Sequence, residues 1–374
     1  TSKKYNTFKS FNGKVESLYG ADFDTSIATA GEKVRIRFSI EIPDDRFSLD
    51  GNLISEETVE FLVDIIKNPH CENGEFDVDA TEREIRFTLQ NIEAEKNDKR
   101  SYAVSRLRQL MCQGEPYGID REKLEKDVKN LDGKKLYDAY ADMLKSSTII
   151  ITACGNLDVE MVKDKFSEFT NSITDRNPAE LETIFITKAD EIRYFKDEMD
   201  VNQAKLVIGL RSGMENADDN YFPFRVMTDI FGGGPYSRLF LNVREKMSLC
   251  YYCSASSVRY KGLLTVDSGV EFENADKAVS EILNQLEIIK NGEFSDFEFE
   301  SSIKSICDSL NTYNDSQNSL DLWYALKINN QNLYSPEDIA EKIKKITRED
   351  VIYAAKGVKL HTIYKLLPKE GPIC

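Results

Sequence analysis

The chain has 374 residues, of which 41% are hydrophobic and 30% charged, and its formal net charge is −16. This composition is typical of a soluble globular protein, and no apolar run reaches the roughly 18 residues that a membrane-spanning helix needs. The negative charge disfavours nucleic acid as a partner, because no basic stripe interleaved with aromatic residues offsets it. The length predicts two domains, each large enough to bury its own core.

The cysteines and the first residues bear on where the protein works. Seven cysteines are scattered between Cys71 and Cys374, an odd number that predicts free thiols and a cytoplasmic location. The N-terminal residues lack the basic and apolar regions of a signal peptide. Because residue 1 is not Met and a helical pattern begins at once, we expect an upstream segment.

Hydrophobic spacing predicts the same kinds of element in both halves of the chain. In the first half, strand-like runs VRIRFSIEI and STIIITAC lie between helical patterns at 7–18, 56–68, 80–95, 134–144 and 159–170. In the second half, the strands AKLVIGL, YYCSASSV and GLLTVDSGV and a C-terminal alternating run, KLHTIYKLL, accompany helical patterns near 220–231, 237–246, 275–291, 297–311 and 336–346.

The two halves also share sequence landmarks in the same order. Leu18 and Gly31 have the same separation as Leu249 and Gly262, and Ile-Ile-Lys-Asn and Asn-Gly-Glu-Phe both recur before another long helix. We therefore predict an α+β fold made of two homologous domains, each a mostly antiparallel sheet covered by helices. We place them at residues 1–175 and 186–374, joined by the polar, proline-containing stretch near 171–190.

Cys250 and Cys253 form a Cys-x-x-Cys where a helix ends and a strand begins. A redox pair needs its first cysteine at the start of a helix, where the dipole lowers the thiol pKa. Positions three apart in a regular strand point to opposite faces, so we expect the two thiols not to converge on a metal. Small apolar core residues are the favoured interpretation.

Other candidate motifs are weak by themselves. Gly232, Gly233 and Gly234 lack the Lys-Ser/Thr of a phosphate-binding loop, so they indicate a helix C-cap or a substrate-facing loop. The two histidines, His70 and His361, lie in no recognisable nucleophile motif, and we expect both on the surface.

Arg244 and Tyr251 lie before a helix end and at the start of a strand, where both side chains can face a cleft. Their spacing alone favours nothing more than a solvated arginine and a partly buried tyrosine. The surrounding residues decide their interpretation.

The segment GGGPYSRLFLNVREKMSLCYYCSAS resembles the second-domain signature of the insulinase/pitrilysin-type zinc metallopeptidases, which include mitochondrial processing peptidase. The run beginning EPYGIDREKLEKDV resembles the same family's Pro-Tyr-Gly segment, followed by a helix and a strand that ends at Gly155. The resemblance covers nearly the whole chain. It implies that the chain is one half of a clamshell, built from the two homologous domains predicted above, the first lacking its N-terminal segment.

In active members of that family, a His-x-x-Glu-His helix supplies two zinc ligands and the general base, and a downstream Glu supplies the third ligand. TEREIRFTLQN resembles the helix of the third ligand: Glu84 matches an accessory Glu, but Asn91 stands where the ligand belongs. A neutral amide is a poor zinc ligand. The His-x-x-Glu-His segment would fall before Thr1. The resemblance thus implies that this chain holds no metal and is inactive on its own.

By contrast, Arg244 and Tyr251 match the family at both positions. The resemblance implies that they act in trans, stabilising the oxyanion that forms in a zinc-bearing partner. We therefore predict a noncatalytic peptidase subunit that binds peptide, with Gly232, Gly233 and Gly234 facing the substrate and zinc in a His-x-x-Glu-His partner.

Two alternatives remain: a non-proteolytic peptide-binding or assembly scaffold of the same fold, and an active zinc peptidase truncated of its His-x-x-Glu-His motif. The segments KNDKRSYAVSRLRQLMC and EPYG resemble a bacterial branch with paired degenerate and metal-bearing proteins. A homodimer in isolation is compatible with the sequence.

Overall fold

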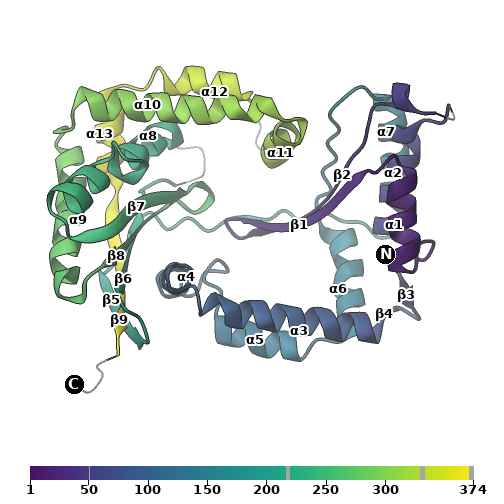
Figure 1. Ribbon diagram of the computed structural model, residues 1–374, viewed down its shortest axis with the longest axis horizontal. Helices are drawn as coiled ribbons and strands as arrows, with labels where there is room; N and C mark the ends of the chain where they lie inside the picture. The colour runs from purple at the N-terminus through teal and green to yellow at the C-terminus, as the bar shows by residue number, and fades with distance from the viewer. Residues whose placement is uncertain (50, 216–219, 329–332, 370–374) are drawn as a thin grey trace.

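The computed structural model of the chain describes residues 1–49, 51–215, 220–328 and 333–369 (Figure 1). Its fold is α+β. Within the described residues, no helix is both long enough and apolar enough to cross a bilayer. The first half contains β1 (Asp22–Ala30), β2 (Lys33–Glu41), the short β3 (Cys71–Glu72) and β4 (Glu75–Phe76), and helices α1 (Phe8–Ser17), α2 (Ile54–Lys67), α3 (Val78–Glu95), α4 (Lys99–Met111), α5 (Arg121–Lys129), α6 (Gly133–Ser146) and α7 (Val159–Asn171). The second half contains β5 (Arg193–Met199), β6 (Ala204–Arg211), β7 (Cys250–Val258), β8 (Leu263–Val270) and β9 (Lys359–Pro368), and helices α8 (Tyr221–Gly232), α9 (Ala275–Lys290), α10 (Asp296–Asn311), α11 (Gln317–Lys327), α12 (Pro336–Ile343) and α13 (Arg348–Gly357).

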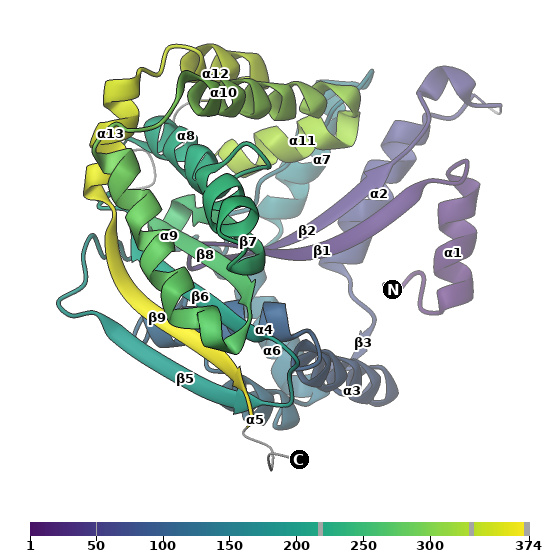
Figure 2. The ribbon, with the colours of Figure 1, turned by 60° about the vertical axis from the view of Figure 1, so that its left-hand side comes forward.

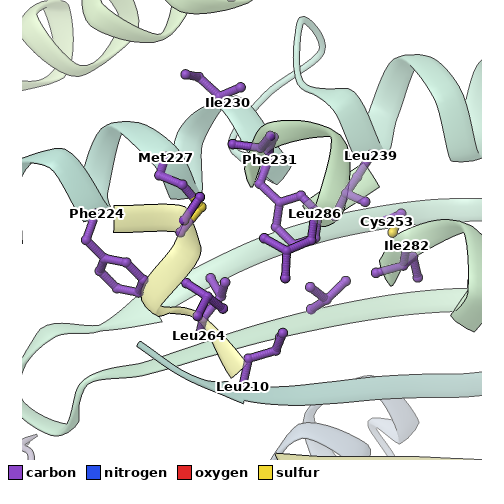
Figure 3. Packing of buried hydrophobic residues seen from close by; sticks show 14 of the residues in the cluster. Leu210, Phe224, Met227, Ile230, Phe231, Leu239, Cys253, Leu264, Ile282 and Leu286 are labelled. Atoms are coloured by element: carbon purple, nitrogen blue, oxygen red, sulfur yellow. The ribbon is translucent and has the colours of Figure 1, made fainter. Parts of the chain in front are cut away.

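The second half is organised around a five-stranded sheet in the order β5-β9-β6-β8-β7. Only the β5–β9 pair is parallel, so the sheet is mostly antiparallel, as predicted. Leu210 of β6, Phe224 and Met227 of α8 and Ile282 of α9 belong to one buried hydrophobic cluster between the sheet and these helices (Figure 3). This apolar layer between the sheet and its helices is the main core of the molecule.

The opposite face of the same sheet is covered by α4, a helix from the first half of the chain. Ala103 and Leu107 of α4 are fully buried against Val207 of β6 and Leu366 of β9. Gly209 permits this approach, because a Cβ there would lie 2.5 Å from the sulfur of Met111. The central strands are therefore covered on both faces.

The sheet of the first half is smaller than predicted. β1 and β2 form a long two-stranded hairpin, which runs from the neighbourhood of α1 and α2 toward β7 (Figure 2). Residues 147–154, predicted as a strand from the run STIIITAC, belong to no strand. β-branched residues favour extended backbone, but a strand forms only where a neighbouring backbone completes the ladder, and the described strands offer this segment no such partner.

The repeated landmarks take the same conformations in both halves. Gly31 and Gly262 both have positive φ, +62° and +58°, at the turns of the β1–β2 and β7–β8 hairpins. Each Ile-Ile-Lys-Asn ends a helix, α2 or α9, and each Asn-Gly-Glu-Phe precedes another, α3 or α10, with its glycine at positive φ. This agreement supports two related units, whereas the boundaries at 1–175 and 186–374 stay a prediction.

Candidate functional site

Arg244 lies in the last turn of a π-helix, Leu239–Lys246. This rare helix type occurs frequently at functional sites. The Arg244 guanidinium stacks over the ring of Phe240 at 4.6 Å and forms a 3.5 Å ion pair with Glu245, with 40% of the side chain exposed. Phe240 of the π-helix therefore holds the Arg244 guanidinium, which stays partly accessible to solvent.

Tyr251 lies at a β-bulge. The register between β7 and β8 shifts between Cys250 and Tyr252, so that Tyr251 has no partner residue on β8. An extra residue in a strand re-aims its side chain. Tyr251 is 51% exposed, whereas its neighbours Cys250 and Cys253 are buried. Two irregular stretches of backbone thus present the arginine and the tyrosine to solvent at one end of β7.

The Tyr251 hydroxyl donates a 2.6 Å hydrogen bond to Oε1 of Glu271, which follows β8 directly. This hydrogen bond and the charge of Glu271 raise the pKa of Tyr251. Arg244 lies close enough to Cys250 for its charge to contribute to the lowered pKa of that thiol. The charge of Arg244 therefore reaches the start of β7, where Tyr251 lies.

The expectation that Cys250 and Cys253 point to opposite faces is wrong. The bulge at Tyr251 adds one residue between them, so both thiols face the core beneath β7, 9% and 6% exposed. A hydrogen bond with Cys253 lowers the pKa of Cys250 to about 7. Within the described residues no group of three potential metal ligands is present. Both cysteines belong to the hydrophobic cluster, as expected of core residues, and Figure 3 shows Cys253 in it.

The glycine run has a packing explanation at its first two positions. Gly232 ends α8, and a Cβ there would lie 2.5 Å from the backbone nitrogen of Ala255 in β7. Gly233 is the C-cap of α8, in agreement with the helix C-cap interpretation, and a Cβ there would collide with Asp229. Gly233 is exposed and Gly234 half-buried, so both remain available for the predicted contact with peptide.

Glu84 and Asn91 both lie on α3, seven residues apart and hence on the same face two turns apart. Both are exposed, as is Phe87 between them. α3 packs on α4 and α5 and lies apart from β7 in both views (Figures 1 and 2). The structure thus does not bring the positions that resemble a zinc site together with Arg244 and Tyr251 in this chain.

A buried ionic cluster, which we had not predicted, joins the two halves. Glu115, the glutamate of the EPYG segment, accepts a 2.7 Å hydrogen bond from Arg211 of β6 and forms a 2.7 Å ion pair with Lys261 of the β7–β8 turn. Lys261 also pairs at 2.7 Å with Glu32 in the β1–β2 turn. The two cations are fully buried. A glutamate next to a Pro-Tyr-Gly turn gives no signal of this pairing, because its partners are distant in sequence.

His361 is also placed differently from the prediction. It is buried in β9, where its Nε2 lies 2.9 Å from Arg193, whereas His70 is half-buried. Burial, followed by the charges of Arg211 and Arg193, lowers the pKa of His361 to about 4. The expectation of a surface histidine is wrong because β9 is an inner strand whose two faces are covered by helices.

With this geometry established, similarity to known proteins decides the family. A family model described as the peptidase M16 inactive domain matches residues 130–306. Over 357 residues the chain is 30% identical to the probable inactive metalloprotease YmfF of Bacillus subtilis. The aligned region covers 96% of this chain and 84% of YmfF. The chain belongs to the M16 family, the insulinase family of peptidases. It is a homologue of an M16 metalloprotease whose name describes it as inactive, and the predicted resemblance is confirmed.

Two further comparisons are informative. The uncharacterized zinc protease YmxG, also of Bacillus subtilis, is 25% identical over 202 residues, covering 52% of this chain and 47% of YmxG. The crystal structure of a conserved protein from Enterococcus faecalis superposes with a TM-score of 0.90 at 23% identity, covering 99% of this chain and 87% of that one. The second comparison confirms the M16-like α+β fold, and the first shows that an organism with an M16 chain named inactive also has one named a zinc protease.

Proposed function

We propose that this chain is the noncatalytic subunit of an M16-family peptidase, which binds peptide and completes a partner's active site in trans. The observation that carries this proposal is the contrast between the Arg244/Tyr251 pair and the position on α3 that corresponds to a zinc ligand. Arg244 and Tyr251 are held exposed by a π-helix and a β-bulge, whereas Asn91 of α3 stands where the family resemblance implies a charged ligand.

The chemistry of the pair fits this role. Attack of a metal-bound water on a peptide carbonyl forms a tetrahedral oxyanion, which a fixed cation and a phenolic donor stabilise. Arg244 supplies the cation and Tyr251 the donor, while Gly233 and Gly234 offer backbone to the peptide. Arginine and tyrosine are not among the usual zinc ligands, which are Cys, His, Asp and Glu, so the proposal assigns the metal to a partner with a His-x-x-Glu-His helix.

The presence of YmxG and YmfF in one organism supports a heterodimer of this kind. The proposal includes the division into units at residues 1–175 and 186–374, whose second unit faces the partner. The cysteines in the described part of the chain carry free thiols, which suits a cytoplasmic location.

Reconstitution with the zinc-bearing partner tests the proposal. Arg244→Ala and Tyr251→Phe each remove one stabilising group, and we expect the rate of peptide cleavage to fall about 10²- to 10³-fold. Arg46→Ala and Tyr353→Phe are matched controls, because both side chains are exposed and far along the chain from the pair. Full activity in both test variants would show the trans role to be wrong.

The same reconstitution separates the alternatives. A pair that binds peptide without cleaving it supports the scaffold. Stoichiometric zinc on this chain alone supports a truncated active peptidase, which Asn91 disfavours. A homodimer in the absence of partner is compatible with the first proposal, provided that it is inactive.

A further inference from the structure

Tyr251 and Glu271 form a contact that bears directly on the availability of the phenol. The Tyr251 hydroxyl has one proton to donate, and it donates this proton to Oε1 of Glu271 at 2.6 Å. Hydrogen bonds to an ionised acceptor are the stronger kind. While this bond exists, Tyr251 cannot donate to an oxyanion.

The backbone places the Glu271 carboxylate next to the bulge. β7 and β8 are antiparallel, and Val270, the residue before Glu271, pairs with Cys250, the residue before Tyr251. Tyr251 and Glu271 therefore lie diagonally across the two strands, a separation that long and aromatic side chains can span. The Glu271 carbonyl accepts a 3.0 Å hydrogen bond from the backbone nitrogen of Asn274 in the turn before α9. The contact is therefore built into the end of the β7–β8 ladder.

We propose that Glu271 is a positioning residue, which holds Tyr251 in the free chain and competes with the peptide carbonyl for its phenolic proton. This inference rests on the proposed function of Tyr251. In the assembled site, Tyr251 becomes a donor to substrate only after its bond to Glu271 opens. The strength of the Tyr251–Glu271 hydrogen bond therefore determines how readily the Tyr251 hydroxyl becomes a donor to substrate.

A titration of the free chain tests the contact without any partner. Tyrosines labelled with ¹³C at Cζ are titrated by NMR, and Tyr251→Phe identifies the Tyr251 signal. Glu271→Gln removes the negative charge, so we expect the pKa of Tyr251 to fall toward its ordinary value of 10.0. Glu273→Gln, the exposed glutamate two residues later, is the matched control. An identical Tyr251 titration in Glu271→Gln and in the unsubstituted chain would overturn the proposal.

The reconstituted pair tests the competition. Because a neutral amide accepts more weakly than a carboxylate, we expect Glu271→Gln to raise the rate of peptide cleavage about five- to tenfold. In a Tyr251→Phe background the same substitution should have no effect. An unchanged or lower rate, or an equal gain in both backgrounds, would overturn the competition. If Tyr251→Phe itself is fully active, the proposed function fails, whereas the titration still reports on the contact alone.

Discussion

Glu115 and Arg211 form a fully buried ion pair of 2.7 Å, although 96 residues separate them in the sequence. Glu115 lies in the loop between α4 and α5, and Arg211 ends β6. Lys261 approaches the second oxygen of the same carboxylate, and Glu32 neutralises Lys261 from the β1–β2 turn. Four segments distant in the sequence meet at this cluster, so it fixes the hairpin and the α4–α5 loop of the first half against the sheet of the second.

Removal of the Glu115 charge is expected to destabilise the chain strongly. Glu115→Gln leaves Arg211 without a buried counter-ion and Lys261 with only one, and breaking a buried ion pair typically costs about 3–5 kcal/mol. The free energy of unfolding in urea measures the loss. Asp138→Asn, which breaks an exposed pair with Lys134 on α6, is the control and should change stability by no more than about 0.5 kcal/mol. Equal effects of the two substitutions would contradict the stabilising role of the cluster.

The same carboxylate predicts a pH dependence. Desolvation acts to raise the pKa of Glu115, but hydrogen bonds and charges from Arg211 and Lys261 outweigh it, so the pKa lies below its ordinary value of 4.5. Its contribution to stability is therefore fully present above pH 4.5 and is lost as the pH falls through the lowered value. We expect the stability difference between the unsubstituted chain and Glu115→Gln to stay constant near neutral pH and to shrink in acid. A difference that grows on acidification would contradict this sign.

The close approach of α4 to the sheet predicts a cost at Gly209. In Gly209→Ala the new Cβ meets the sulfur of Met111 at 2.5 Å and Leu107 at 3.2 Å, and overpacking of this kind costs about 1–3 kcal/mol. Gly13→Ala is the opposite case, because Gly13 lies inside α1 with no atom within 4 Å of its new methyl group. Alanine stabilises a helix interior by up to about 1 kcal/mol relative to glycine. Denaturant midpoints should move in opposite directions, and a shift of both in the same direction would argue against the described packing.

Metal analysis should separate this chain from an active M16 peptidase. We expect substoichiometric zinc in the purified chain by plasma mass spectrometry, and no change in Tm on addition of EDTA, because Asn91 offers no charged ligand. Asn91→Glu should not create a zinc site, since Glu84 and residue 91 on α3 provide at most two carboxylates. Stoichiometric zinc whose removal lowers the Tm would contradict the noncatalytic assignment.

Local sequence patterns predicted much of the fold but missed several elements. The α+β class, the two hairpins and all ten predicted helical segments are present, the segment near 237–246 as a π-helix. The labelled helices and strands without a prediction are α4, α5, α11, α13, β3, β4 and β5. In α4, arginine and serine stand between the apolar positions Ala103, Leu107 and Met111, which recur every four residues and could have indicated the helix. The burial of α4 depends on packing against the sheet of the other half, and the residues of α4 alone do not predict that contact.

The sequence by itself indicated the M16 family and the residues proposed for its site. Arg244, Tyr251 and the substitution at Asn91 follow from residue types at fixed spacing, and the paired Leu and Gly landmarks indicate repeated turns that only certain backbones permit. Tertiary structure alone decided how these residues are presented. The bulge that turns Tyr251 outward and both thiols inward arises from the register between β7 and β8, and the pairing of Glu115 with Arg211 requires two distant segments to meet. Strand register and long-range proximity depend on interactions between segments, and a local pattern of residues does not contain them.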